Sequence, residues 1–95
     1  MASVLNLAKI GHVPDGAVYI GRFNSRYRVA ASKWRNPFVV GRDGSRAEVI
    51  EKYRQWIIGQ PELLAALPEL RGKDLVCWCA PEACHGQILV ELANR

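Results

Sequence analysis

The chain has 95 residues, of which 49% are hydrophobic, and its formal net charge is +4. This length supports one core and predicts a single domain over residues 1–95, while the apolar content excludes a disordered chain. No apolar run is long enough to span a bilayer. Because the N-terminal residues lack the layout of a signal peptide, we expect a cytoplasmic protein without membrane contact.

The first half of the chain predicts short extended segments separated by turns and one long basic loop. Ser3–Leu7 alternates weakly and can form a first strand, and the turn residues between 9 and 16 follow it. Ala17–Ile20 is a β-prone run that ends at Gly21. The loop that follows is rich in arginine, and Asn36-Pro37 closes it with a turn.

The clearest helix begins after Ser45, because Ser45 and Glu48 form the pattern of a capping box. Its apolar stripe is made of Val49, Ile50, Tyr53, Trp56 and Ile57. Gly59 ends this helix, and Pro61 at a first helical position starts a short second one.

The last third of the chain predicts a buried strand, a tight turn and a final helix. Leu75–Cys79 is continuously apolar or soft, as in a strand that is buried on both faces. Pro81 breaks this strand because proline cannot donate to a ladder. From Cys84 to about Asn94 the apolar spacing becomes helical, so Cys84 is expected at a helix N-terminus.

Together these elements predict an α/β protein: a small three-layer, Rossmann-like domain with helices on both faces of its sheet. We expect three to four mostly parallel strands, with Leu75–Cys79 central and Val18–Ile20 beside it. The helix capped by Ser45 is expected to pack the face that contains Val49, Tyr53 and Trp56 on the sheet.

The cysteines are three in number and lie between positions 77 and 84, an odd and clustered set that is a poor disulfide framework. Cys84 and His85 suggest a catalytic thiol site, since a helix N-terminus and a nearby histidine favour a reactive thiolate. Alternatively, the cysteines are small core residues and His85 hydrogen-bonds a backbone carbonyl.

A tetrahedral zinc site is a third reading of the same cluster, with Cys77, Cys79, Cys84 and His85 as its ligands. The spacing suits it poorly, because adjacent Cys84 and His85 would have to diverge to reach one ion. We therefore predict that the chain binds no metal and no other cofactor. If it does bind a metal, the expected ion is zinc.

Basic residues concentrate between Gly21 and Asp43, and no acidic residue interrupts them: Arg22, Arg26, Arg28, Lys33, Arg35 and Arg42. Arg22 follows a predicted strand end and can hold a phosphate, while Lys33, Trp34 and Asn36 can add a cation, a stacking face and an amide. A solvated basic face with Trp34 in the core is the simpler alternative.

If the strands are parallel, their carboxyl ends share one edge, where open α/β sheets bind ligands. Cys79 and Gly86 are then expected near Arg22, Cys84 and His85, and Gly86 would allow close approach of a ligand.

Several motifs together resemble a family of small proteins from phages and bacteria that is catalogued as a domain of unknown function. The segments that carry this resemblance are Tyr19-Ile20-Gly21-Arg22, then Ser32-Lys33-Trp34-x-Asn36-Pro37-Phe38, and Cys77-Trp78-Cys79-Ala80-Pro81-x-x-Cys84-His85-Gly86. The chain departs from the family pattern at Arg35, where the family has glycine, and at Gln87, where it has an acidic residue. The resemblance implies a Rossmann-like fold and a site around the cysteines, but no particular activity.

Two classes of function follow from the sequence. The first is an enzyme-like domain that binds a nucleotide or the phosphates of nucleic acid, with Cys84 and His85 in its site. The second is a non-catalytic binding module, such as a phage protein that docks to nucleic acid or to a host protein, in which the cysteines are structural or bind zinc.

Overall fold

The computed structural model describes residues 3–78 and 84–94 of the chain. Its elements follow in the order β1 (Val4–Asn6), α1 (Leu7–Ile10), β2 (Val18–Tyr19), α2 (Arg46–Ile58), α3 (Pro61–Ala66), the 3-10 helix η1 (Leu67–Leu70), β3 (Leu75–Cys77) and α4 (His85–Ala93). Among the described residues, none of the helices combines the length and the apolar character that a bilayer crossing requires.

A parallel three-stranded sheet in the order β1-β3-β2 forms the centre of the molecule. Val4 of β1 and Val18 of β2 both stand in register with Leu75 of β3. The backbone amide of Ile20 continues the second ladder by donating to the carbonyl of Val76 at 2.9 Å. The last strand is thus central, as its unbroken apolar sequence predicts, and all three of its residues are buried.

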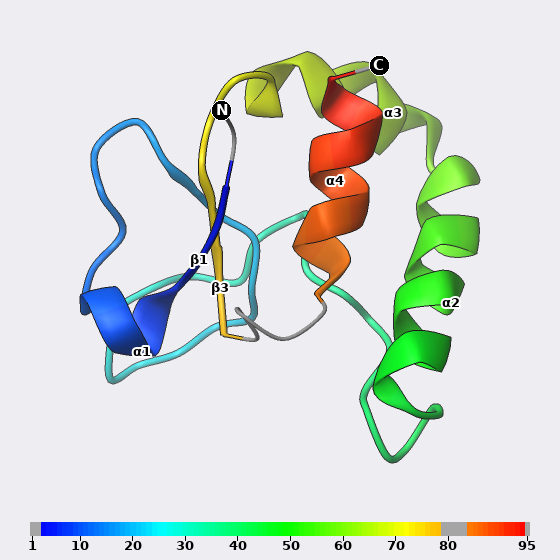
Figure 1. The fold of residues 1–95 in the computed structure, drawn as a ribbon, viewed down its shortest axis with the longest axis horizontal. Coiled ribbons are helices and arrows are strands. Elements are labelled where there is room, and N and C mark those ends of the chain that lie inside the picture. The colour runs from blue at the N-terminus through cyan, green and yellow to red at the C-terminus, as the bar shows by residue number, and fades with distance from the viewer. Residues whose placement is uncertain (1–2, 79–83, 95) are drawn as a thin grey trace.

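Both of the longer helices lie on the same side of the sheet (Figure 1). Helix α4 packs against β3, and α2 packs chiefly against α4 and α3. The apolar stripe of α2 predicts packing directly on the sheet, so the structure corrects this prediction. The buried residues of α2 are Val49, Tyr53 and Ile57, while Trp56 is only partly buried. The α/β class and the parallel sheet are therefore confirmed. The predicted three-layer, Rossmann-like arrangement, with helices on both faces of the sheet, is not confirmed.

The opposite face of the sheet is covered partly by the loop that follows β2. The ring of Tyr27 from this loop meets Trp78 edge-on, with 5.1 Å between ring centroids. The indole Nε1 of Trp78 donates to the hydroxyl of Tyr19 at 2.8 Å. Val76 points away from its neighbours Leu75 and Cys77, because side chains alternate along a strand, and it is fully buried.

Helices α2, α3 and α4 begin at the residues that their sequences predict. Ser45 accepts from the amide of Glu48 while the Glu48 carboxylate accepts from the amide of Ser45, which completes the capping box of α2. Pro61 is the first residue of α3. Cys84 is the N-cap residue of α4, so the helix begins where the apolar spacing changes from strand to helix.

Two elements differ from the sequence-based prediction. Strand β3 ends at Cys77, so Trp78 lies beyond the strand although the apolar run continues through it. Residues 7–10 form the short helix α1 directly after β1, whereas the sequence predicts a strand as far as Leu7 and a turn from Lys9. Asn6 caps this helix by accepting from the amide of Ala8, and Gly11 ends it with a left-handed conformation at φ 77°. The side chain of Leu7 is fully buried, and this burial stabilises a helix too short to be stable by itself.

Candidate functional site

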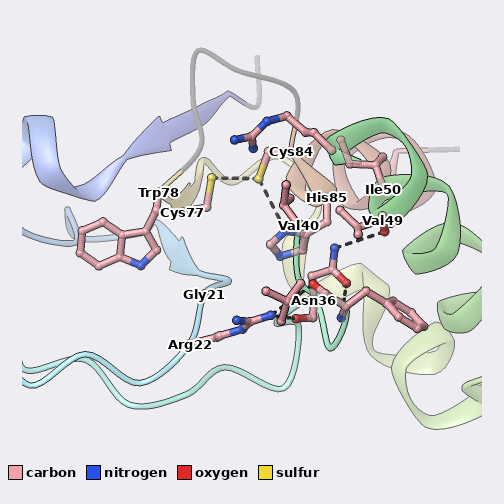
Figure 2. Close-up of a pocket in the computed structure, with 13 residues that line it drawn as sticks. Gly21, Arg22, Asn36, Val40, Val49, Ile50, Cys77, Trp78, Cys84 and His85 are labelled. Carbon is pink, nitrogen blue, oxygen red and sulfur yellow. Dashed lines mark hydrogen bonds between the residues drawn. The ribbon is translucent and has the colours of Figure 1, made fainter. Parts of the chain in front are cut away.

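A pocket of about 230 Å³ opens where the carboxyl end of β3 meets the N-termini of α2 and α4 (Figure 2). Residues from five segments line it: Gly21, Arg22, Asn36, Phe38, Val39, Val40, Arg46, Val49, Ile50, Cys77, Trp78, Cys84 and His85. The position agrees with the rule that open α/β sheets bind ligands beyond the carboxyl ends of their strands.

Cys84 and His85 lie next to each other in the wall of this pocket. The Sγ of Cys84 is 3.5 Å from Nδ1 of His85, and Nε2 of His85 is 2.9 Å from the carbonyl oxygen of Ile20. The amide of Gly86 donates to Sγ of Cys84 at 3.4 Å. Both side chains are buried, with exposed fractions of 2% for Cys84 and 8% for His85. The histidine is thus held by backbone on one side and faces sulfur on the other.

Cys77 brings a second sulfur to the same point. It is the last residue of β3, and its Sγ lies 3.0 Å from that of Cys84. Figure 2 shows the two side chains pointing towards each other, from the strand end and from the start of the helix. Both residues are thiols in this structure.

Arg22 is the basic residue from the loop after β2 that reaches the pocket. Its Nη2 donates to the backbone carbonyls of Asn36 and Phe38, at 2.9 and 3.2 Å. These bonds tie the segment that contains Asn36 to the strand end. Asn36 is held further by its amide group, which donates to the carbonyl of Val49 in α2 at 3.4 Å. Arg22 and Asn36 therefore share the pocket with Cys84 and His85.

Lys33 and Trp34, the other two residues of the basic loop that were predicted for ligand binding, do not line this pocket. The ammonium group of Lys33 lies 3.0 Å from the carboxylate of Glu69 and 5.4 Å from the ring centroid of Trp34. Trp34 is 2% exposed and belongs to the core cluster, so its ring offers little surface for stacking on a base.

Gly86 is buried in the first turn of α4, where the helix crosses the sheet closely. A Cβ atom at this position would lie 2.9 Å from Cδ1 of Ile20 and 3.1 Å from Cγ2 of Val4. The absence of a side chain is thus required by helix–sheet packing, and Gly86 does not line the pocket. Cys79, which was also predicted near the ligand, lies outside the described residues.

Tyr53 of α2 supports the site from the core. Its hydroxyl donates to the backbone carbonyl of Trp34 at 2.8 Å, and its ring meets the imidazole of His85 edge-on at 4.9 Å. Burial raises the pKa of the Tyr53 hydroxyl well above its ordinary value, and the nearby charge of Cys84 raises it further. The hydroxyl therefore stays a neutral donor that fixes the tryptophan-bearing loop.

Arg46 and an apolar wall complete the pocket, and the sequence does not mark them as site residues. The wall consists of Phe38, Val39, Val40, Val49 and Ile50. Arg46 is the first residue of α2, directly after the Ser45 cap. The capping box predicts this position at a helix N-terminus, but only the fold shows that this end of α2 lies beside that of α4.

Within the part of the chain that the structure describes, no group of three or more histidine, cysteine, aspartate or glutamate residues is arranged to hold a metal ion. Two of the four ligands considered for zinc, Cys77 and Cys84, have their sulfurs in direct contact, and Cys79 is not described. The geometry of the described residues thus offers a thiol–imidazole pair beside a cationic group and an apolar wall. Such a pair supports nucleophilic chemistry and the binding of an anion with an apolar body.

Comparison with known proteins identifies viral relatives of the chain. It is 36% identical over 85 residues to an uncharacterized protein of Acanthamoeba polyphaga mimivirus, covering 79% of this chain and 65% of the relative. It is 39% identical over 61 residues to an uncharacterized 12.4 kDa protein in the nrdA-td intergenic region of Enterobacteria phage T4, covering 59% of this chain and 56% of that protein. The chain thus spans less than two thirds of the length of either relative. No solved structure matches it significantly.

Residues 5–95 match the family described as "Domain of unknown function (DUF4326)". This match covers the strand-bearing core, the basic loop, the pocket residues and the whole of the cysteine segment. The chain therefore belongs to the DUF4326 family.

Proposed function

We propose that this chain binds an anionic ligand of nucleotide type, either a free nucleotide or a nucleic-acid phosphate, and acts on it through Cys84 and His85. The observation that carries the proposal is the alignment of three groups: the Ile20 carbonyl, the imidazole of His85 and the thiol of Cys84. The last two of these residues line the pocket. In nucleophilic enzymes a base contacts the nucleophile and is itself oriented by a third group.

Hydrogen-bond chemistry assigns the roles within this alignment. The carbonyl of Ile20 can only accept, so Nε2 of His85 carries the proton that bonds to it at 2.9 Å. In the neutral imidazole, Nδ1 is then the acceptor, and it faces Sγ of Cys84. The histidine is thereby held in the tautomer that can take a proton from the thiol.

The proposed chemical step starts with transfer of the thiol proton of Cys84 to Nδ1 of His85. The Gly86 amide and the positive end of the α4 dipole stabilise the thiolate that remains. The sulfur then forms a bond to an electrophilic carbon of the ligand, and the group that leaves takes the proton back from Nδ1.

Arg22 is the proposed phosphate contact. Within the described part of the chain, its hydrogen bonds use Nη2 alone, so Nε and Nη1 keep N–H donors for a ligand. Each charge-assisted bond to phosphate contributes roughly 1.5–3 kcal/mol before ordering costs. The apolar wall around Val40 and Ile50 suits the uncharged body of a nucleotide.

A non-catalytic binding module is the second candidate function. One observation favours it: Cys77 and Cys84 are 1% and 2% exposed and belong to the hydrophobic core cluster, as structural cysteines do. In this alternative the pocket binds its partner through Arg22 and the apolar wall, and the thiols only pack.

Titration of the purified chain with nucleoside monophosphates, and with single- and double-stranded oligonucleotides, tests the proposal. Arg22→Ala should weaken binding about tenfold or more, and Arg22→Lys should weaken it less because the charge remains. Arg35→Ala is the matched control, since this exposed arginine lies outside the pocket. Binding should also weaken as salt rises.

Absence of salt-sensitive binding, or equal losses in the Arg22 and Arg35 variants, would overturn the proposed ligand class. Cys84→Ser separates the two candidate functions. If the chain is an enzyme, this variant binds the ligand but no longer turns it over. If the chain is a binding module, the wild type shows no turnover and Cys84→Ser binds as well as the wild type does.

A further inference from the structure

We propose that Cys77 and Cys84 are a redox pair that converts reversibly between two thiols and one intramolecular disulfide. The inference goes beyond the proposed function and does not depend on it, because it requires neither a nucleotide nor turnover. It rests on the placement of the two sulfurs, on the groups around Cys84 and on access through the pocket.

The two sulfurs are already close enough that only a small movement separates them from a covalent bond. They are 3.0 Å apart, and a disulfide bond is about 2.05 Å long. A shift of about 1 Å, shared between two side chains, thus joins them. Figure 2 shows no other labelled side chain between them.

The fold holds both cysteines in this arrangement. Cys77 is in register with Asn6 of β1, in the central strand of the sheet, and it is 1% exposed. Cys84 is the N-cap of α4, where Gly86 donates to its sulfur. Strand end and helix start are packed in the same core cluster, so the entropy of bringing the thiols together is already lost on folding.

The surroundings of the two sulfurs assign them different roles. Cys84 has an N–H donor and the imidazole of His85 within 3.5 Å, and both groups favour its thiolate. Cys84 also lines the pocket, which is the side from which an oxidant would approach its sulfur. Cys84 is therefore the attacking thiol, and Cys77 resolves the intermediate.

A disulfide such as glutathione disulfide can be the oxidant that converts the two thiols to a disulfide bond. The Cys84 thiolate attacks one sulfur of the oxidant and expels one glutathione thiolate, which leaves a mixed disulfide. The deprotonated Cys77 sulfur then attacks Sγ of Cys84 and expels the second glutathione. Two electrons and two protons pass from the chain to the oxidant, and reduction by excess thiol reverses both steps.

Oxidation would also change the pocket, since both cysteines line it. The disulfide consumes the sulfur proposed as the nucleophile and removes the thiol that faces Nδ1 of His85. The oxidised chain would then be inactive in any reaction that uses Cys84, whatever the substrate.

Equilibration of the chain in buffers of increasing glutathione disulfide to glutathione ratio tests the pair. Acid quenching and alkylation in denaturant, followed by intact mass spectrometry, count the remaining thiols. Cys79→Ser is the matched variant because it removes the third cysteine and leaves the proposed pair. Wild type and Cys79→Ser should both lose two thiols without retaining glutathione, and dithiothreitol should restore them.

Protease mapping locates the bond. Cleavage after Trp78 and after Glu82 places each of the three cysteines in its own fragment, so the two fragments that stay linked identify the bonded cysteines. The Cys79→Ser chain is also equilibrated in denaturant as a reference. The folded Cys79→Ser chain should form its disulfide at a ratio of glutathione disulfide to glutathione at least tenfold lower than the denatured chain does. The double variant Cys77→Ser/Cys79→Ser, if it folds, should stop at a mixed disulfide on Cys84 because no resolving thiol remains.

Two results would overturn the proposal. One is a Cys79→Ser chain that keeps both thiols at every ratio, or that oxidises no more readily when folded than when denatured. The other is a wild-type disulfide that maps to Cys79. Both decisive comparisons use chains with the native Cys77 and Cys84, so they do not depend on the folding of a variant of the pair.

Discussion

Gly86→Ala is the substitution whose effect can be worked most directly from the packing of α4 on the sheet. The new Cβ would lie 2.9 Å from Cδ1 of Ile20 and 3.1 and 3.2 Å from the two γ-methyls of Val4. Favourable carbon contacts begin at about 3.5 Å, so the nearest contact is about 0.6 Å too short. The helix or the two strand side chains must therefore move.

Neither strand side chain can move freely. Ile20 is fully buried, and Val4 is β-branched and has little rotamer freedom. Overpacking of this kind costs about 1–3 kcal/mol, whereas Gly→Ala gains at most about 1 kcal/mol in helix propensity. We expect Gly86→Ala to lower the free energy of unfolding by about 1–2 kcal/mol.

Urea unfolding measures this loss as a lower midpoint at an unchanged slope. Gly59→Ala is the control, because the nearest atom to its Cβ would be the carbonyl oxygen of Trp56 at an ordinary 3.5 Å. That variant should stay within about 0.5 kcal/mol of the wild type. If Gly86→Ala is as stable as Gly59→Ala or more so, the close approach of α4 to the sheet is refuted.

Four further predictions concern the core, the α2 cap, acid stability and metal content. Tyr53→Phe leaves the buried Trp34 carbonyl without its donor and should cost about 1–3 kcal/mol in urea unfolding; a loss under 0.5 kcal/mol would argue against this bond. Ser45→Ala should cost about 1 kcal/mol in the same assay. Hydrogen bonds from Ser45 lower the pKa of Glu48. The ionised carboxylate therefore stabilises the folded chain at pH values above the ordinary pKa of glutamate, and this stabilisation is lost as the pH falls through the lowered pKa. Glu48→Gln should make the urea midpoint less dependent on pH in this acidic range. Elemental analysis should find no stoichiometric zinc, and one zinc per chain that disappears in Cys84→Ser would show instead that the cysteine cluster binds zinc.

The features that the sequence predicts correctly depend on local chemistry. The capping box of Ser45 and Glu48 requires only residues within one helical turn. The central position of β3 follows from its unbroken apolar run, and the start of α4 at Cys84 follows from the change in apolar period. Parallel pairing of β2 with β3 then places Arg22 at the same edge of the sheet as Cys84 and His85. Asn36 is held at this edge by the hydrogen bond from Arg22 to its backbone carbonyl.

The features that the sequence does not predict depend on contacts between distant segments. Lys33 pairs with Glu69, and the backbone carbonyl of Trp34 accepts from the hydroxyl of Tyr53, because the basic loop folds back on the core in a way that no local pattern specifies. The contact between Arg46 at one helix start and the pocket likewise depends on how α2 packs beside α4. Charge clustering in the sequence thus identifies the basic loop, but not which of its cations face the site.

We propose that a reactive Cys84 and an anion-binding Arg22 share one pocket, and alkylation of Cys84 in the presence of nucleotides measures whether they do. The reduced chain is treated with iodoacetamide, and the fragment that begins after Glu82 reports modification of Cys84 separately from the other two cysteines. We expect at least one of the common ribonucleoside monophosphates to slow this modification in the wild type and in Arg35→Ala, and we expect the protection to be lost in Arg22→Ala. An alkylation rate of Cys84 that no nucleotide changes, at concentrations where binding is saturated, would contradict the shared pocket.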